Sequence, residues 1–250
     1  MRPEAENVPV SVPRTEAASV VASFLLLRRV IGWIGTLLPV VLVAGDAVFS
    51  SAPLPISLSD YYYTPMRNIM VGSLCVLGVF LVLYDVGVRL DHWVTNIAGV
   101  GVLGVAFLPG SPEVAHLTTS EEVIGNVHVV FASIAFVAFS ITTWRFGRAD
   151  SDGPNAEAPS KRACTFYRAS SLVMLVFIVL SGVAILVPVS IQDDTKVLFI
   201  LEALACMTFG MSFLVKGQGL QPLVSAPGVA LARNPGQPGS NSPASEEPLG

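Results

Sequence analysis

Charged residues are scarce in this 250-residue sequence: Asp, Glu, Lys and Arg together make up 13% of it, against about 25% in an ordinary soluble domain. Cysteine is scarce too. The three that are present (Cys75, Cys164 and Cys206) lie far apart and form no CxxC pair. This spacing favours neither a disulfide framework nor a thiolate metal site. Apolar residues make up 52% of the chain, and its mean hydropathy is +0.67. The composition therefore indicates a protein whose solvent is lipid.

Long apolar runs recur along the chain. Six of them are long enough to cross a hydrocarbon core about 30 Å thick, which takes about 20 helical residues. They are Val30–Ser50, Asn68–Gly87, Trp93–Pro109, Asn126–Phe146, Ser170–Ser190 and Val197–Val215. The sequence therefore predicts an all-α, polytopic membrane helix bundle with about six transmembrane helices, a multi-pass protein of the cell membrane.

Lys and Arg are distributed unevenly between alternate loops. If the N-terminus is cytoplasmic, 12 of the 14 basic residues fall in inner segments, and only Arg67 and Lys196 fall in outer ones. The positive-inside rule then predicts that both termini are cytoplasmic. We expect residues 1–29 to be a cytoplasmic N-terminal segment and residues 30–216 the six-helix transmembrane domain. Residues 217–250 are rich in Pro, Gly and Ser, which predicts a disordered cytoplasmic tail.

Polar residues within the apolar runs, or at their outer ends, are the candidates for function. An ionisable group inside a membrane is costly and usually faces the interior of the bundle. Glu202 lies about 9 Å along the last helix from Lys196, at 1.5 Å per residue, and His128 enters the fourth helix at a similar outer level. The predicted set for one outward-facing pocket is Asp46, Asp60, Tyr62, Arg67, Asn68, His128 and Glu202. Within this set, Arg67 and Glu202 are expected to share one polar network; alternatively, the same groups only hold helices together.

Sequence signals for catalysis or for a bound cofactor are weak. Residues 96–104 (NIAGVGVLG) contain a GxGxxG pattern, but the strand and the βαβ unit that dinucleotide binding requires are missing. Close packing of membrane helices is the better interpretation of these glycines. Ser57, Ser59 and Thr64 are candidate nucleophiles, although a GxSxG elbow is absent. No cofactor, metal or nucleic acid is expected, and the expected partners are membrane lipid and a small-molecule ligand.

Four blocks of the sequence resemble a family of uncharacterised bacterial multi-span integral membrane proteins, a domain of unknown function. The blocks are residues 27–45, 57–85, 96–109 and 201–217, and YYYTPMRNIMVG in the second is the most distinctive. The resemblance implies a six-helix bundle and supplies no catalytic residues. It adds weight to positions inside the blocks, namely Ser59, Tyr62, Arg67, Asn68 and Glu202.

Three classes of function stay open. The protein could bind or move a small molecule or lipid through the outward-facing polar pocket. It could be a membrane-embedded hydrolase that acts on outer-leaflet lipid with His128, Glu202 and an acidic partner. It could also be a structural or assembly protein. A polar network without a reactive centre favours the first or the third class.

Overall fold

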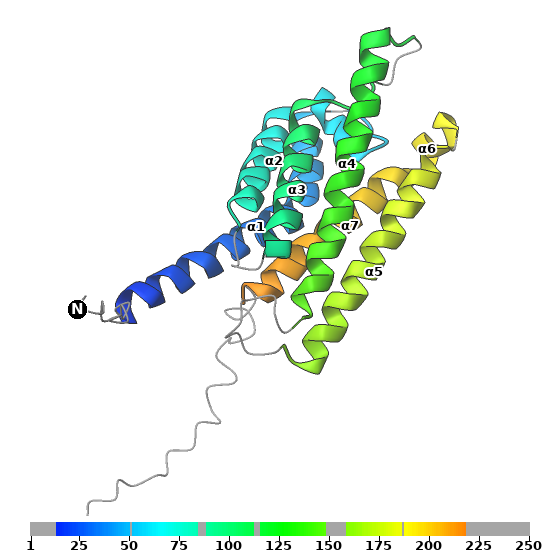
Figure 1. Cartoon of the computed structure of the whole chain (residues 1–250). Coiled ribbons are helices and arrows are strands. Elements are labelled where there is room, and N and C mark those ends of the chain that lie inside the picture. Colours follow the sequence, from blue (N-terminus) through cyan, green and yellow to red (C-terminus); the bar gives the residue numbers. More distant parts are fainter. Residues whose placement is uncertain are drawn as a thin grey trace, which may run out of the picture. The chain divides into compact units, whose positions relative to one another are not determined.

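The computed structural model of the protein describes residues 14–50, 52–84, 89–112, 116–148, 159–186 and 188–218. Every regular element in these ranges is helical (Figure 1). The elements are α1 (Arg14–Phe49), the 3₁₀ helix η1 (Leu58–Tyr63), α2 (Arg67–Val82), α3 (Arg89–Phe107), α4 (Thr119–Phe146), α5 (Lys161–Ala184), α6 (Val189–Thr195) and α7 (Val197–Lys216). Most of the predicted disordered tail, from residue 219 onwards, lies outside the described residues, as do residues 1–13 of the predicted N-terminal segment.

Five of the described helices are long and apolar enough to cross a membrane: α1 over Ala22–Phe49, and α3, α4, α5 and α7 over their full lengths. The remaining apolar helix, α2, is shorter, with 16 residues. These helices confirm the predicted all-α, polytopic helix bundle. They also follow the order of the six predicted runs, although α2 ends at Val82 rather than Gly87.

The fifth predicted run is divided between two helices. It was expected to continue to Ser190, but α5 ends at Ala184 and the short helix α6 begins after Pro188. Proline has no backbone N–H to donate and favours the beginning of a helix over its interior. At Lys196, φ is 50°, and this left-handed residue separates α6 from α7.

Helix α7 packs against α1, α4 and α5, while α2, α3 and α4 contact one another in succession. Glycine permits the closest of these contacts. A Cβ added to Gly99 of α3 would lie 2.6 Å from the carbonyl oxygen of Gly78 in α2, and one added to Gly101 would lie 3.0 Å from the Cβ of Ala135 in α4. The GxGxxG pattern therefore lies in contacts between helices, as the packing interpretation predicted.

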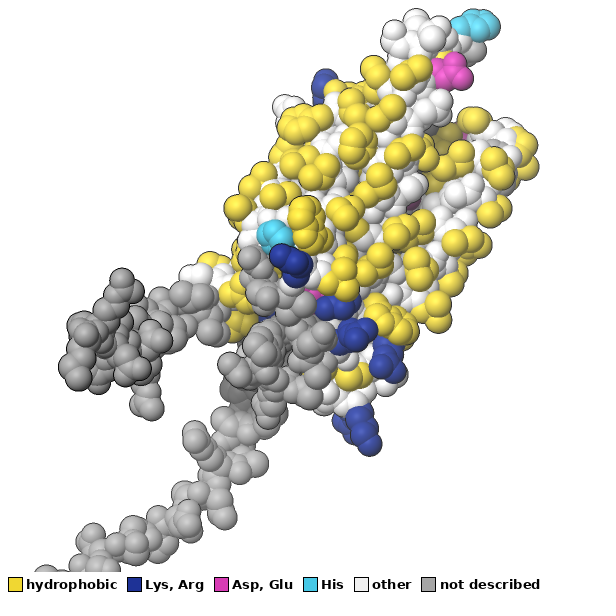
Figure 2. Space-filling view, in the orientation of Figure 1, with side chains coloured by type: hydrophobic (Ala, Val, Ile, Leu, Met, Phe, Trp, Pro, Cys, Tyr) yellow, Lys and Arg dark blue, Asp and Glu magenta, His cyan; other side chains and the backbone are white. Residues whose placement is uncertain are grey.

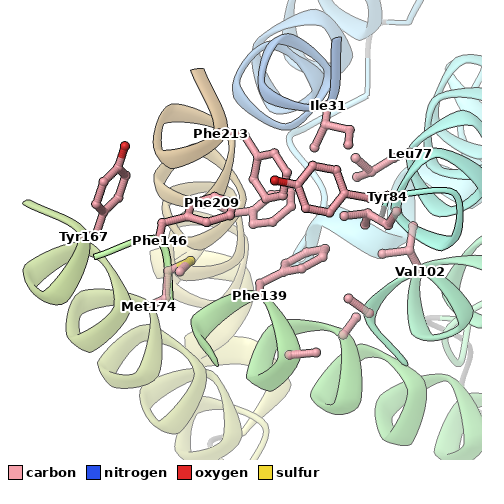
Figure 3. Packing of buried hydrophobic residues seen from close by; sticks show 14 residues of the cluster. Ile31, Leu77, Tyr84, Val102, Phe139, Phe146, Tyr167, Met174, Phe209 and Phe213 are labelled. Carbon is pink, nitrogen blue, oxygen red and sulfur yellow. The ribbon is translucent and has the colours of Figure 1, made fainter. Parts of the chain in front are cut away.

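Aromatic side chains fill the centre of the bundle (Figure 3). The rings of Phe139 and Phe209 stack with their centroids 3.7 Å apart. Phe213 continues this cluster along α7, 4.8 Å from Phe209 and 5.6 Å from Tyr84. The cluster joins α4 and α7 to the end of α2.

Apolar side chains cover the visible sides of the bundle, whereas Lys and Arg gather at one end (Figure 2). We call this end the basic end. Arg89 begins α3 there, Arg145 is in the last turn of α4, Lys161 begins α5 and Lys216 ends α7. The opposite end, which we call the η1 end, contains η1, the beginning of α4 and the beginning of α7. An apolar belt with one basic end is typical of a protein that spans a bilayer.

Candidate functional site

The connection between α1 and α2 is folded against α7 at the η1 end. Ser57 and Asp60 form a capping box around the beginning of η1, in which the Ser57 N–H donates to Asp60 Oδ2 over 2.8 Å. The carbonyl of Ile56 accepts a hydrogen bond of 2.9 Å from the N–H of Phe199, in the first turn of α7. These bonds fix η1 over the end of the bundle.

Glu202 reaches η1 from α7. Its Oε2 accepts a hydrogen bond of 2.8 Å from the backbone N–H of Leu58. The carboxyl thereby compensates one of the N–H groups that the beginning of a helix leaves without an intrahelical partner. A carboxyl that sequence analysis placed inside the last transmembrane helix thus receives a backbone donor from a loop.

His128 connects three segments of the chain. It belongs to α4 and is only 5% exposed. Its Nδ1 lies 2.6 Å from the carbonyl oxygen of Leu108, and its Nε2 lies 2.9 Å from Ser59 Oγ. Because a carbonyl oxygen only accepts, Nδ1 is the nitrogen that carries the hydrogen in the neutral ring. Nε2 therefore presents a lone pair to the Ser59 hydroxyl.

Asp60 completes this group, which we call the polar cluster: Ser59, Asp60, His128 and Glu202. Burial raises the pKa of Asp60, and this effect outweighs the hydrogen bonds from Ser57 and the positive fields of His128 and Lys196, all of which lower it. Asp60 also interacts electrostatically with Glu202. The cluster thus combines two carboxyl groups, an imidazole and a hydroxyl.

Two cavities meet at Glu202. The first has a volume of about 70 Å³, and Ser59 and Glu202 are the polar residues in its lining, which otherwise includes Leu77, Val102 and Phe139. The second, of about 110 Å³, lies between α4, α5 and α7. The two share Ala132, Phe136 and Glu202 in their linings. The polar cluster therefore borders two largely apolar spaces.

Three of the seven predicted pocket residues, Asp60, His128 and Glu202, come together in this cluster. Tyr62 and Arg67 instead pair with each other: the guanidinium of Arg67 donates to the Tyr62 hydroxyl and lies 4.0 Å from the centre of its ring. The predicted network was to join Arg67, the tyrosine run and Glu202. Its tyrosine part is present as the Arg67–Tyr62 contact, whereas the described hydrogen bond of Glu202 comes from the backbone of Leu58. Asn68 is exposed.

Asp46 lies beside Tyr61, apart from the two cavities. Asp46 is 5% exposed and Tyr61 is fully buried. Burial, and secondarily the charge of Asp46, raises the pKa of Tyr61 to about 12, so the phenol keeps its proton. Asp46 Oδ1 and the Tyr61 hydroxyl have no hydrogen-bond partner among the described residues. Neither residue lines either cavity.

Two members of the site were missing from the predicted pocket set. Ser59 was only one of three candidate nucleophiles, and the carbonyl of Leu108 had no signal at all, because any residue presents the same backbone oxygen. In the described ranges, no three His, Cys, Asp or Glu side chains are arranged to hold a metal ion.

No family model, curated protein or solved structure matches this chain. Its resemblance to a family of bacterial membrane proteins therefore stays a prediction, and the function has to be argued from the geometry of the polar cluster.

Proposed function

We propose that the protein binds an amphipathic molecule, a lipid or a lipid-like small molecule, at the polar cluster. The observation that carries this proposal is the position of Glu202, where two cavities meet within the helix bundle. A carboxyl group is expensive to place inside a membrane and is usually retained for function. Among the described residues its hydrogen-bond partner is one backbone N–H, so its other oxygen lone pairs have room for a ligand.

The two cavities favour an apolar group next to a polar one. An engineered apolar cavity of about 150 Å³ in another protein holds benzene. The cavities here, of about 70 and 110 Å³, are each smaller, so each suits part of an acyl chain or a small apolar group. The polar part of the ligand would then lie against Ser59, His128 and Glu202.

The charges in the cluster limit which polar group is acceptable. Asp60 and Glu202 are both acids, and neither forms an ion pair among the described residues. A phosphate or carboxylate on the ligand would therefore gain no ion pair with a Lys or Arg partner of these two side chains, and wherever either acid is ionised it would repel the anion. We therefore infer a neutral or cationic polar group, such as an ester, a hydroxyl or an amine.

The packing favours binding over passage through the bundle. Phe139 lines the first cavity and stacks on Phe209 at 3.7 Å. Phe213 and Tyr84 extend this cluster of aromatic rings towards the basic end. Movement of a ligand from one end to the other would require these rings to separate.

Photo-crosslinking tests the proposal directly. The purified full-length protein in nanodiscs is irradiated with a monoacylglycerol that carries a diazirine in its acyl chain. We expect crosslinks on the parts of α4 and α7 that line the cavities. Ala132→Leu would fill space shared by both cavities and should reduce these crosslinks at least several-fold. Ala44→Leu, at an exposed position of α1, is the matched control and should leave them unchanged.

The corresponding diazirine fatty acid provides the charge control and should crosslink more weakly at the same positions. Equal crosslinking in Ala132→Leu and in the unmodified protein would contradict the proposal. So would crosslinks spread evenly over all lipid-facing helices, which would favour a purely structural role for the cluster.

A further inference from the structure

We propose that Ser59 is a nucleophile and His128 its general base, so that the site hydrolyses the carboxylic ester of a neutral amphiphile. This inference rests on the proposed binding function, because it takes the same ligand class, and it adds a reaction and the residues that perform it.

The hydrogen bonds of His128 carry the argument. Ser59 Oγ lies 2.9 Å from Nε2, and the Leu108 carbonyl lies 2.6 Å from Nδ1. The carbonyl fixes the hydrogen on Nδ1, so the Nε2 lone pair faces the hydroxyl. A general base that activates a serine needs this tautomer and a distance of about 2.6–3.2 Å. In serine hydrolases a third group orients the histidine; here the backbone of residue 108 takes that position.

Of the three candidate nucleophiles, Ser59 is the one whose hydroxyl meets a base. The side chain of Ser57 belongs to the capping box. The hydroxyl of Thr64 donates to the carbonyl of Tyr61 over 3.0 Å. Among the described residues, both groups are thus engaged in local turn structure, whereas Ser59 joins a side chain 69 positions away.

Ser59 is also placed where an ester would arrive. It lines the first cavity together with Glu202, and His128 lines the second. An acyl chain in the first cavity would bring its carbonyl carbon to the polar rim, next to Ser59 Oγ. Glu202 acts as a positioning residue, because it holds the N–H of Leu58 next to the nucleophile. The negative field of Asp60 reaches His128 and would stabilise the imidazolium that forms during the reaction.

The reaction balances with water as the only co-reactant. Ser59 Oγ attacks the ester carbonyl carbon while its proton moves to His128 Nε2. The tetrahedral intermediate collapses, the C–O bond to the alcohol breaks, and Nε2–H protonates the departing alcohol. A water then gives a proton to Nε2 and attacks the acyl-serine. When this second intermediate collapses, Ser59 Oγ leaves and recovers its proton, and the carboxylic acid is released.

A fluorophosphonate probe tests the nucleophile independently of any substrate. The full-length protein in detergent is treated with the probe, and the modified residue is identified by peptide mass spectrometry. We expect phosphonylation of Ser59 and none in Ser59→Ala. His128→Asn should slow labelling about 100-fold or more, although its amide can still donate to the Leu108 carbonyl. Ser190→Ala, an exposed position in α6, should label like the unmodified protein.

Release of fatty acid from a monoacylglycerol by the same variants gives the second readout. The folded state of each variant is checked by gel filtration and thermal unfolding. If His128→Asn is folded and labels normally, or if Ser59 in the folded protein stays unlabelled, the inference is wrong.

Failure of this inference is distinguishable from failure of the proposed function. Crosslinking of the diazirine monoacylglycerol to Ser59→Ala, without labelling of Ser59 in the unmodified protein, would leave binding intact and overturn the hydrolase. Labelling of Ser59 without cavity crosslinks would overturn the binding site for this ligand and leave a reactive serine.

Discussion

The two ends of the bundle treat buried charge differently. At the basic end, Asp91 and Arg145 form an ion pair in which each side chain is 9% exposed, and Arg28 donates to the Tyr84 hydroxyl over 2.8 Å. At the η1 end, the described partners of Glu202 and His128 are a backbone N–H, a carbonyl and a hydroxyl. Asp91 at the basic end is thus neutralised by an opposite charge, whereas the described hydrogen bonds of Glu202 and His128 at the η1 end come from neutral groups.

This difference separates groups that hold the fold from groups that are available for chemistry. The two members of a buried ion pair neutralise each other, and removal of one member leaves the other as an unpaired buried charge. A carboxyl with one backbone donor keeps acceptor capacity, and Glu202 keeps it beside two cavities. The functional proposals therefore concern the η1 end. Variants at the basic end provide the comparison for variants at the η1 end.

The largest expected difference between the ends is in their accessibility from outside the cell. In a variant whose three native cysteines are replaced, Glu122→Cys at the η1 end and Lys161→Cys at the basic end are both at exposed positions. The excess of Lys and Arg at the basic end predicts that it is cytoplasmic. A membrane-impermeant maleimide added to intact cells should label Glu122→Cys and leave Lys161→Cys unlabelled. The reverse pattern would invert the orientation and make the polar cluster face the cytoplasm.

The next effect is on stability, at the basic end. Asp91→Ala should lower the free energy of unfolding by about 3–5 kcal/mol, because it leaves Arg145 buried without its carboxylate. Unfolding in mixed micelles, followed by circular dichroism, measures the loss. The double variant Asp91→Leu/Arg145→Met should recover part of it. Arg89→Met, at an exposed position of the same helix, is the control and should stay within about 0.5 kcal/mol of the unmodified protein. Equal losses at positions 89 and 91 would show that the ion pair has no special role.

The smallest effect is the pH dependence of stability at the η1 end. Because burial raises the pKa of Asp60 above its ordinary value of 3.8, the folded protein favours the protonated carboxyl. This contribution is fully present below the unfolded pKa and is lost as the pH rises through the folded pKa. Asp60→Asn keeps an oxygen for the Ser57 N–H and cannot titrate. Between pH 4 and pH 8, the unmodified protein should lose stability relative to Asp60→Asn, measured by thermal unfolding in detergent. Parallel curves for the two proteins would contradict the prediction.

Much of the fold is predictable from the sequence because membranes restrict the choices. Backbone polar groups have no water to bond in the hydrocarbon core, so an apolar run of sufficient length must form a helix there. The helical form of the apolar runs follows from that constraint, and the gathering of basic residues at one end follows from the uneven distribution of Lys and Arg between alternate loops. The division of the fifth run was less predictable, since it depends on how α6 begins at Pro188 and ends at the left-handed Lys196.

The meeting of Asp60, His128 and Glu202 was partly predictable, because each lies at a similar depth in its predicted helix or loop. Depth does not determine which side of a helix a residue faces, so it could not separate the Arg67–Tyr62 part of the predicted network from Glu202. The fold of η1 against α7 decided which groups meet. Glu202 of α7 accepts a hydrogen bond from the N–H of Leu58, and Arg67 contacts Tyr62, five residues before it in the chain.

The sequence by itself thus indicated lipid as the solvent and located the apolar helices along the chain, since both depend on local composition and on backbone hydrogen bonding. Several helix ends, such as those of α2 and α5, were not determined in this way. The tertiary structure alone decided that Ser59 meets His128. That contact needs a 3₁₀ turn to lie over the bundle and the carbonyl of Leu108 to hold the imidazole in one tautomer. A backbone carbonyl is the same at every residue, so only the packing of α3 against α4 gives this one its role.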